Sequence, residues 1–345
     1  MGEVRIGTSG WSYPSGPGAW NGIFYPSRRS RGAGRAAKAG DLVYYAEHFD
    51  TVEVNSSFYR IPDPAIASRW AAQTPSRFDF CLKLFQQFTH PAMYLRTAGA
   101  SAGGEESPIP AVAGTDVDAF RRSIEPIASA GKLGALLAQF PPAFRHGAEA
   151  SGYLAWLMQA FSDYPVAVEL RHRSWSDREQ DVLDLLRAHG AAWAQIDEPK
   201  FRFSIRQSRL SNLGSLYYMR LHGRNAEKWW QHDHPDERYN YLYSPAEIEG
   251  FADTVTRVRE LVQKIYVFMN NHFAGKAVAN AAALRHAVGQ PVPGGYEDEM
   301  LARYPFLEGI VARTGADLLF DGLENEGGDG PGGTDTAEDA EPREG

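Results

Sequence analysis

The chain has 345 residues, 43% of them hydrophobic, and a formal net charge of −8. It can build one large core or two ordinary ones, and no apolar run approaches the roughly 18 residues that a membrane helix needs, so we expect no membrane partner. A single cysteine, Cys81, excludes an internal disulfide framework, and no signal-peptide pattern opens the chain, so the expected compartment is the cytoplasm.

Strand-like and helix-like runs alternate along the chain. The expected strands are Val4–Gly10, Thr51–Ser57, Asp79–Phe85, Leu133–Phe140, Val166–Arg171, Ala192–Asp197, Ser215–Gly223 and Lys264–Asn271. Helical periodicity is found over Leu42–Phe49, Asp63–Gln73, Asp116–Gly131, Glu149–Phe161, Asp177–His189, Pro245–Val262 and Lys276–Ala287. Residues 198–214 show no clear helix.

Eight strands separated by helices favour an α/β fold of the (β/α)8 type over an open doubly wound sheet. Neither a GxGxxG nor a GxxxxGK[ST] motif occurs, so the usual dinucleotide and P-loop fingerprints are absent. We predict a single TIM-like barrel over residues 1–290, followed by a helical extension over residues 291–320.

The negative charge is concentrated at the C-terminus. Residues 321–345 hold nine acidic residues and one basic residue, whereas residues 1–320 hold 34 of each sign. This last segment is rich in Gly, Asp, Glu and Thr, and it cannot bury enough apolar surface to offset the entropy of ordering. It is predicted to be a disordered acidic tail.

Most of the predicted strands end in polar or aromatic residues. In a TIM barrel the chemistry lies at the carboxyl ends of the strands, so these residues are the candidate site. The candidate substrate-binding residues are Trp11, Asn55, Tyr59, Lys83, His90, Gln139, Arg171, His172, Arg220, His222, Asn270 and Asn271.

The second expected strand shows the pattern most clearly. Along Thr51–Ser57 the alternation places Glu53, Asn55 and Ser57 on one face. An enclosed carboxylate is costly unless it meets a partner or a ligand. This face is therefore expected to form a wall of the site.

Ordered motifs over residues 4–287 carry a resemblance to a known family. They include Gly7-Thr8-Ser9-Gly10-Trp11-Ser12-Tyr13, Val52-Glu53-Val54-Asn55-Ser56-Ser57-Phe58-Tyr59-Arg60, Gln139-Phe140-Pro141-Pro142, Glu169-Leu170-Arg171-His172, Arg220-Leu221-His222-Gly223 and Asn270-Asn271. The chain resembles the YecE-like family, also called domain of unknown function 72. The resemblance implies a TIM-barrel-like fold and leaves the activity open. Segments 27–40 and 91–115 look longer than is usual in that family.

Three carboxylates are the candidate acid/base residues. If Glu53 and Glu169 both face the barrel interior, their proximity would raise the pKa of one of them, and Asp197 is a third candidate. The alternative is that each carboxylate pairs with an arginine, as the shared parity of Glu169 and Arg171 allows. A structural ion pair and an acid/base role are both consistent with the sequence.

Several cations are expected at the same end of the barrel. Two loops carry basic residues without an acidic one between them: Arg28, Arg29, Arg31, Arg35 and Lys38, and then Lys200, Arg202, Arg206 and Arg209. Such a rim would concentrate an anionic ligand, although a solvated charge run is the alternative for each loop alone. Lys83 could form a Schiff base or bind a phosphate or carboxylate, and the second use is preferred.

Other chemistries remain open on the same strand ends. Histidines and carboxylates at the strand ends could bind a divalent metal such as zinc or manganese, although no HxH or HExxH spacing occurs. The candidate ligands are His90, Glu169, His172, Asp197, His222, Glu53 and His272. Ser9, Ser57 and Cys81 lack the context of a covalent nucleophile. Loop aromatics could stack on a sugar or a base: Trp11, Tyr13, Trp20, Phe58, Tyr59, Trp175, Trp229 and Trp230.

The sequence thus favours an enzyme acting on a small anionic ligand that is phosphorylated, nucleotide-like or sugar-like. In this hypothesis Arg171, Arg220 and Lys83 hold the anion, while Asn55, His222 and Asn270 orient it. A barrel that binds nucleic acid through a basic and aromatic rim is the alternative. A purely structural protein is disfavoured by the many ionisable groups at the strand ends. The sequence leaves the oligomeric state open.

Overall fold

The computed structural model describes residues 1–27, 35–97, 107–208 and 214–314, with backbone only for residues 35–39. Nine parallel strands form one sheet in the order β6-β5-β4-β3-β2-β1-β9-β8-β7. Their bounds are β1 Glu3–Ser9, β2 Thr51–Val54, β3 Asp79–Lys83, β4 Leu133–Gln139, β5 Val166–Glu169, β6 Ala192–Trp193, β7 Gln195–Asp197, β8 Leu216–Leu221 and β9 Lys264–Met269.

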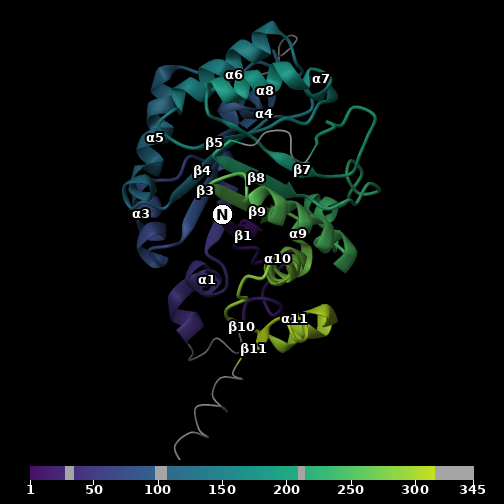
Figure 1. The fold of residues 1–345 in the computed structure, drawn as a ribbon. Helices are drawn as coiled ribbons and strands as arrows, with labels where there is room; N and C mark the ends of the chain where they lie inside the picture. The colour runs from purple at the N-terminus through teal and green to yellow at the C-terminus, as the bar shows by residue number, and fades with distance from the viewer. Residues whose placement is uncertain (28–34, 98–106, 209–213, 315–345) are drawn as a thin grey trace, which may run out of the picture.

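The sheet closes on itself through one short stretch of chain. Only Ala194 separates β6 from β7; β6 pairs with β5, while β7 pairs with β8. The run 192–197 therefore joins both edges of the sheet, and helices surround the resulting ring (Figure 1). The predicted TIM-like barrel is confirmed, and the sixth predicted strand is the one divided into β6 and β7.

Helices follow most of the strands, as the periodicity predicted. The longer ones are α1 Arg35–His48, α3 Pro64–Gln73, α5 Gly114–Ser129, α6 Ala148–Ala160, α8 Glu179–Ala188, α9 Pro245–Arg259 and α10 Lys276–Ala287. Shorter ones are α2 Ser56–Tyr59, α4 Pro91–Thr97, α7 Arg173–Ser176 and α11 Asp298–Arg303, with 3-10 turns η2 Gln86–Phe88, η3 Pro235–Tyr239, η4 Phe273–Gly275 and η5 Pro305–Leu307. Among the described residues of the connection between β7 and β8, no α-helix forms.

Local signals in the sequence set several helix starts. Ser244 begins α9 with a capping box, in which its hydroxyl accepts from the amide of Glu247 and the Glu247 carboxylate accepts from the Ser244 amide. Pro245 occupies the first turn, where its missing N–H costs nothing. Asp63 caps α3 with a single bond, in which its carboxylate accepts from the amide of Ala65.

The second strand is shorter than predicted. It ends at Val54, and α2 begins at Ser56, so the alternation that placed Glu53, Asn55 and Ser57 on one face does not extend past Glu53. The Ser57 hydroxyl instead donates to the carbonyls of Val54 and Lys83, which fixes the turn.

Two hydrophobic layers support the barrel. The larger lies between the sheet and the helices, and the smaller fills the barrel interior with Cys81, Ala135, Leu137, Ala167, Ala192, Ala194, Leu216, Tyr218, Tyr266 and Phe268. Small side chains on β4–β6 face large aromatic ones on β8 and β9. Gly134 makes room for this, because a Cβ there would lie 2.5 Å from the Tyr266 hydroxyl.

The ring hydroxyls of this layer point to opposite ends of the barrel. Tyr266 donates to Asp79 at the amino ends of the strands, at 2.7 Å, and Tyr218 donates to Glu53 near the carboxyl ends, also at 2.7 Å. An ionic layer therefore lies on each side of the apolar one. The layer at the carboxyl ends forms the floor of the candidate site.

The residues after 290 pack onto the barrel. They include α11, η5 and the short parallel pair β10 Gly295–Tyr296 and β11 Ala312–Arg313. Tyr296, Met300 and Leu307 are fully buried within the larger core layer. The predicted acidic tail, residues 321–345, lies outside the described residues.

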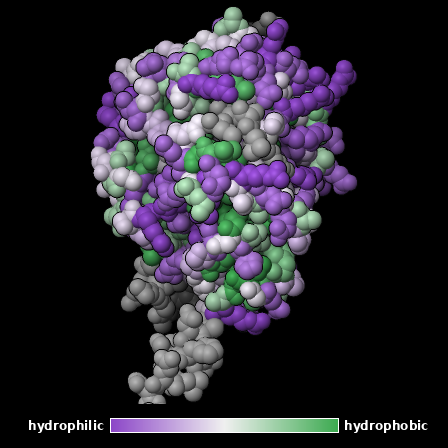
Figure 2. All heavy atoms as spheres, in the orientation of Figure 1, coloured by the Kyte–Doolittle hydropathy of each residue, from purple (hydrophilic) through white to green (hydrophobic). Residues whose placement is uncertain are grey.

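The visible face of the molecule is mostly hydrophilic, with small apolar patches between the polar side chains (Figure 2). None of the described helices is both long and apolar enough to cross a membrane.

Candidate functional site

A cavity of about 520 Å³ opens at the carboxyl ends of the strands. Residues that follow β1, β2, β3, β4, β5, β7, β8 and β9 all contribute to its lining. The lining residues are Tyr13, Asn55, Phe58, Tyr59, Lys83, His90, Met93, Gln139, Pro141, Pro142, Arg171, Glu198, Phe201, Phe203, Ser204, Arg220, Trp229, Trp230, Pro235, Asp236, Arg238, Tyr239, Asn270 and His272. The arrangement matches the usual position of a TIM-barrel site.

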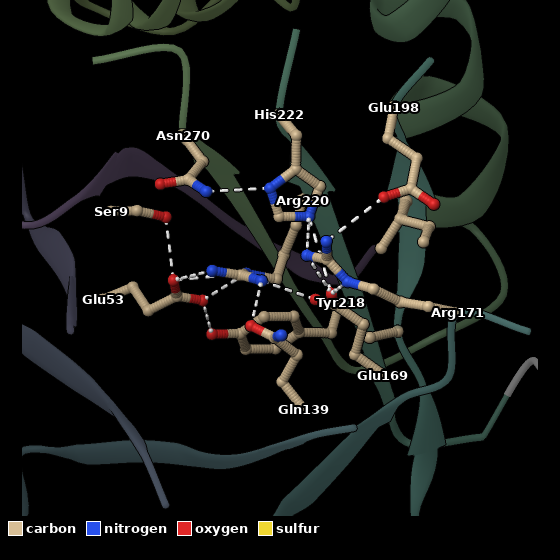
Figure 3. Close-up of polar contacts among 12 residues, drawn as sticks. Ser9, Glu53, Gln139, Glu169, Arg171, Glu198, Tyr218, Arg220, His222 and Asn270 are labelled. Atoms are coloured by element: carbon tan, nitrogen blue, oxygen red, sulfur yellow. Dashed lines mark hydrogen bonds and ion pairs between the residues drawn. The ribbon is translucent and has the colours of Figure 1, made fainter. Parts of the chain in front are cut away.

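Arg220 of β8 holds the floor of this cavity together (Figure 3). Its Nη2 lies 2.6 Å from Oε1 of Glu53, its Nε lies 2.9 Å from Oε2 of Glu53, and its Nη1 lies 2.5 Å from Oε2 of Glu169. Arg220 is 1% exposed, and both carboxylates are fully buried. All three guanidinium nitrogens are therefore used within the protein.

Both carboxylates receive further donors. Ser9 donates to Glu53 at 2.8 Å, and Arg171 donates to Glu169 through Nε at 2.7 Å. Burial alone would raise the pKa of Glu169, but Arg220 and Arg171 outweigh it and hold that pKa well below its usual range. The sequence allowed either an acid/base role or a structural ion pair for these carboxylates, and the structure shows the ion pairs.

Glu198 extends the network to the cavity wall, and the sequence reasoning missed it. Its Oε2 lies 3.3 Å from Nη1 of Arg171, and the residue is 5% exposed. Burial raises the pKa of Glu198, and neither Arg171 nor Lys200 fully offsets this. The one available signal was its position next to Asp197 at the end of the sixth strand.

Asn270 lines the adjacent part of the cavity, and the fully buried His222 lies beside it. The amide of Asn270 lies 2.8 Å from Nδ1 of His222, and Nη2 of Arg171 lies 3.2 Å from Nε2. Burial, with Arg171 and Arg220 nearby, lowers the pKa of His222 to about 3. The imidazole is therefore neutral at physiological pH.

Lys83 is the last residue of β3, and it lines the cavity. Unlike Arg171 and Arg220, it is not paired with a carboxylate in the described part of the chain. Nζ lies 3.8 Å from the centre of the Phe58 ring, and no hydrogen bond or ion pair joins it to any described residue. Burial, followed by the field of Arg220, lowers the pKa of Lys83 to about 7. His90 also lines the cavity, and burial lowers its pKa to about 3.

An aromatic group stands at the mouth of the cavity. Phe201 and Phe203 stack with ring centres 5.8 Å apart, and Trp230 lies 5.8 and 6.0 Å from them. Trp230 is 56% exposed. Among the loop aromatics expected from the sequence, Trp20 and Trp175 are instead fully buried core residues.

Four predicted site residues lie elsewhere. Asp197 lines a second cavity and is paired with Arg224, with both N–O distances 2.8 Å. His172 caps α7, Trp11 packs edge-on against Trp70, and Asn271 donates to the Tyr241 carbonyl. These side chains have structural partners and do not line the cavity at the strand ends.

The proposed metal ligands do not converge. Within residues 1–27, 35–97, 107–208 and 214–314, no three histidine, cysteine, aspartate or glutamate side chains are grouped so that they could hold a metal ion. The basic residues Arg28, Arg29, Arg31, Arg35, Lys38 and Arg209 lie outside the described side chains.

Comparison with known proteins identifies the family. Residues 5–299 match the family model described as "Protein of unknown function DUF72". The chain belongs to the DUF72 family. The resemblance inferred from the strand-end motifs is thereby confirmed, and the description of the family assigns no activity.

Relatives of this DUF72 protein cover most of its length. The UPF0759 protein YunF of Bacillus subtilis (strain 168) is 28% identical over 285 residues, which cover 80% of this chain and 92% of YunF. The crystal structure of a DUF72 family protein from Thermotoga maritima is 31% identical with a TM-score of 0.67, covering 83% of this chain and 99% of that one. A DUF72 family protein from Enterococcus faecalis, at 24% identity and a TM-score of 0.67, covers 86% and 100% and supports the fold.

Proposed function

We propose that this DUF72 protein is an enzyme that acts on a small anionic ligand, phosphorylated, nucleotide-like or sugar-like, bound in the strand-end cavity. The observation that carries the proposal is the state of the cations around that cavity. Arg171 and Arg220 are neutralised by buried glutamates, whereas Lys83 and Arg238 have no carboxylate partner among the described residues.

Arg238 is placed to bind an anion from the loop after β8. Its Nε is buried without a hydrogen-bond partner, and its Nη2 contacts Nε2 of His232 at 3.0 Å. A guanidinium presents a fork of donors that fits a carboxylate or a phosphate.

Because Arg171 and Arg220 are already paired with glutamates, we no longer assign them the role of binding the anion. Their guanidinium groups hold Glu53, Glu169 and Glu198 in place, and we assign them the task of shaping the floor. Glu198 is the better placed proton carrier, because it lines the cavity and has a raised pKa.

The lining also suits a ring-shaped ligand. The stacked pair Phe201 and Phe203, with Trp230, offers faces on which a sugar or a base can pack. Asn55, Gln139 and Asn270 bring amide groups to the same cavity for hydrogen bonding.

Calorimetric titration tests the proposal with inorganic phosphate, ribose 5-phosphate and adenosine monophosphate, and with ribose as the uncharged control. We expect saturable binding of a phosphorylated probe that Arg238→Gln weakens by about tenfold, as loss of a charge-assisted contact does. Arg202→Gln, an exposed cation between Phe201 and Phe203, is the matched control and should bind normally. Binding that is equal for ribose, or unchanged in Arg238→Gln, would overturn the proposal.

Nucleic-acid binding is the second candidate, because two aromatic side chains beside the cavity are exposed. Tyr59 is 62% exposed, and Trp230 shares its loop-rich surface with the exposed cations Lys200 and Arg202. Such a platform would stack single-stranded bases. The affinity for a labelled oligonucleotide should then fall steeply with salt, whereas binding of a small ligand should respond weakly.

A further inference from the structure

The amine of Lys83 stands apart from the other lysines whose contacts are defined. Lys132 donates to the carbonyl of Thr74 at 2.7 Å, Lys264 pairs with Asp79 at 2.6 Å, and Lys276 donates to Asn240. Lys83 has no acceptor within the described part of the chain, and its Nζ lies against the face of the Phe58 ring. The amine therefore faces the cavity with its hydrogen-bonding capacity unused.

The surroundings of Lys83 favour its neutral form. Burial is the largest cause that lowers the pKa of Lys83. The positive charges of Arg220 and Arg171 lower it further, whereas the negative charges of Glu169 and Glu53 raise it. Glu169 and Glu53 do not offset burial and the two arginines, so the pKa of Lys83 is lowered. His90 is neutral beside it, so it adds no positive charge. At neutral pH a large fraction of the amine carries a free electron pair.

The same cavity holds the other groups that a lysine nucleophile needs. Arg238 can bind an anionic group of the substrate, and Glu198 can carry a proton because burial raises its pKa. Phe58 and Trp229, which are buried, add apolar surface to the same lining.

We propose that Lys83 forms an imine with the carbonyl group of an anionic aldehyde or ketone bound in the strand-end cavity. This inference rests on the proposed function and specifies its substrate class and its first chemical step. The Lys83 nitrogen forms a bond to the carbonyl carbon as the C=O double bond becomes single, and one proton passes from that nitrogen to the oxygen, which gives a carbinolamine.

The rest of the step balances without another reactant. The oxygen leaves as water while the nitrogen loses its second hydrogen and the C=N bond forms, so no oxidant or reductant is consumed. A protonated imine withdraws electrons from the neighbouring carbon. It would thereby assist proton removal from that carbon or cleavage of the next carbon–carbon bond.

Reductive trapping on the wild-type protein tests the inference. The protein is incubated with pyruvate, with glyceraldehyde 3-phosphate or with uncharged propanal, and sodium cyanoborohydride converts any imine to a stable secondary amine. Peptide mass spectrometry then compares Lys83 with Lys276 and the exposed Lys200. We expect Lys83 to be modified by an anionic carbonyl at least about tenfold faster than either, because burial lowers the pKa of its amine to about 7 and the anion binds in the same cavity.

The Arg238→Gln variant adds a second readout. It should slow trapping of the anionic probes at Lys83 and leave propanal unaffected, because only the anionic probes use the guanidinium. Equal modification of Lys83 and Lys200 by every probe would overturn the inference. If phosphate binding still depends on Arg238 in that case, the proposed function stands without the imine; if that binding is also absent, both fail.

Discussion

Arg220 of β8 reaches across the barrel to Glu53 of β2, with Nη2 2.6 Å from Oε1 and Nε 2.9 Å from Oε2. Two strands, β1 and β9, separate β8 from β2 in the sheet. The pair therefore closes the carboxyl end of the barrel beneath the cavity. The contribution of this ion pair to stability depends on every partner being present, since a buried charge is tolerated only when it is paired.

Removing the central guanidinium should be costly. Arg220→Met leaves Glu53 and Glu169 buried without their shared partner, and we expect a loss of about 3–5 kcal/mol in the free energy of unfolding. Urea denaturation followed by circular dichroism measures it. Arg173→Met, which removes an exposed pair with Asp177, is the matched control and should cost less than about 1 kcal/mol. A similar small loss for both variants would contradict the buried network.

The protein should lose stability in mild acid. Burial lowers the pKa of His222 and of His272 to about 3, below the value of about 6.5 in an unfolded chain. The unfolded state therefore binds more protons between these values, so stability is complete above about pH 6.5 and falls as the pH decreases. The pKa of Glu169 is lower in the folded protein than in the unfolded chain, so protonation of this carboxylate lowers the stability further below about pH 4.

Urea titrations between pH 8 and pH 4 check this prediction. His222→Gln should reduce the slope of unfolding free energy against pH by about 1.4 kcal/mol per pH unit, the value for one proton. His286→Gln, at the exposed end of α10, is the control. An unchanged slope in His222→Gln would show that this imidazole is not held neutral by the fold.

Two glycines should respond to alanine in opposite directions. A Cβ at Gly7 of β1 would lie 2.3 Å from the carbonyl oxygen of Thr51, so Gly7→Ala must push β1 away from β2 and should cost about 1–3 kcal/mol. Gly152 in α6 has no atom within 4 Å of the equivalent position, and Gly152→Ala should add about 0.5–1 kcal/mol. Thermal melting distinguishes the two, and a stable Gly7→Ala variant would contradict the strand pairing described.

Glu198→Gln should strengthen anion binding. The substitution removes a negative charge from the cavity wall and leaves Arg171 with less compensation. We expect phosphate affinity to rise about two- to fivefold, the range for a partly screened charge. Glu249→Gln, at an exposed position of α9, should leave the affinity unchanged. Weaker binding in Glu198→Gln would mean that the carboxyl group itself holds the ligand.

The sequence predicted the barrel well because the periodic signals were local. A continuous apolar run identifies β4 and a capping box identifies the start of α9 without knowledge of the rest of the chain. The site was harder, because its organisation depends on distances between strands far apart in the sequence. Strand parity suggested that Glu169 shares a face with Arg171, but nothing local indicated that Arg220 joins Glu53 to Glu169.

The differences between the predicted and the observed positions have physical causes of the same kind. Asp197 was chosen as the acid of the sixth strand, yet Arg224 and Tyr243 bind it, and the next residue, Glu198, lines the cavity. Arg238 could not be recognised because its long loop carries no periodic pattern. Among the loop aromatics, Trp20 and Trp175 are buried in the core whereas Trp230 is exposed beside the cavity. The sequence could not separate them, because burial depends on tertiary packing.

The central claim is that an anion binds in the strand-end cavity beside Lys83 and Arg238, which have no carboxylate partner among the described residues. A crystal soaked in selenate, with anomalous diffraction recorded at the selenium edge, locates a bound dianion directly. The account predicts an anomalous peak inside the cavity, within hydrogen-bonding distance of Lys83 or Arg238. Peaks confined to exposed cations such as Arg202, with the cavity empty, would contradict it.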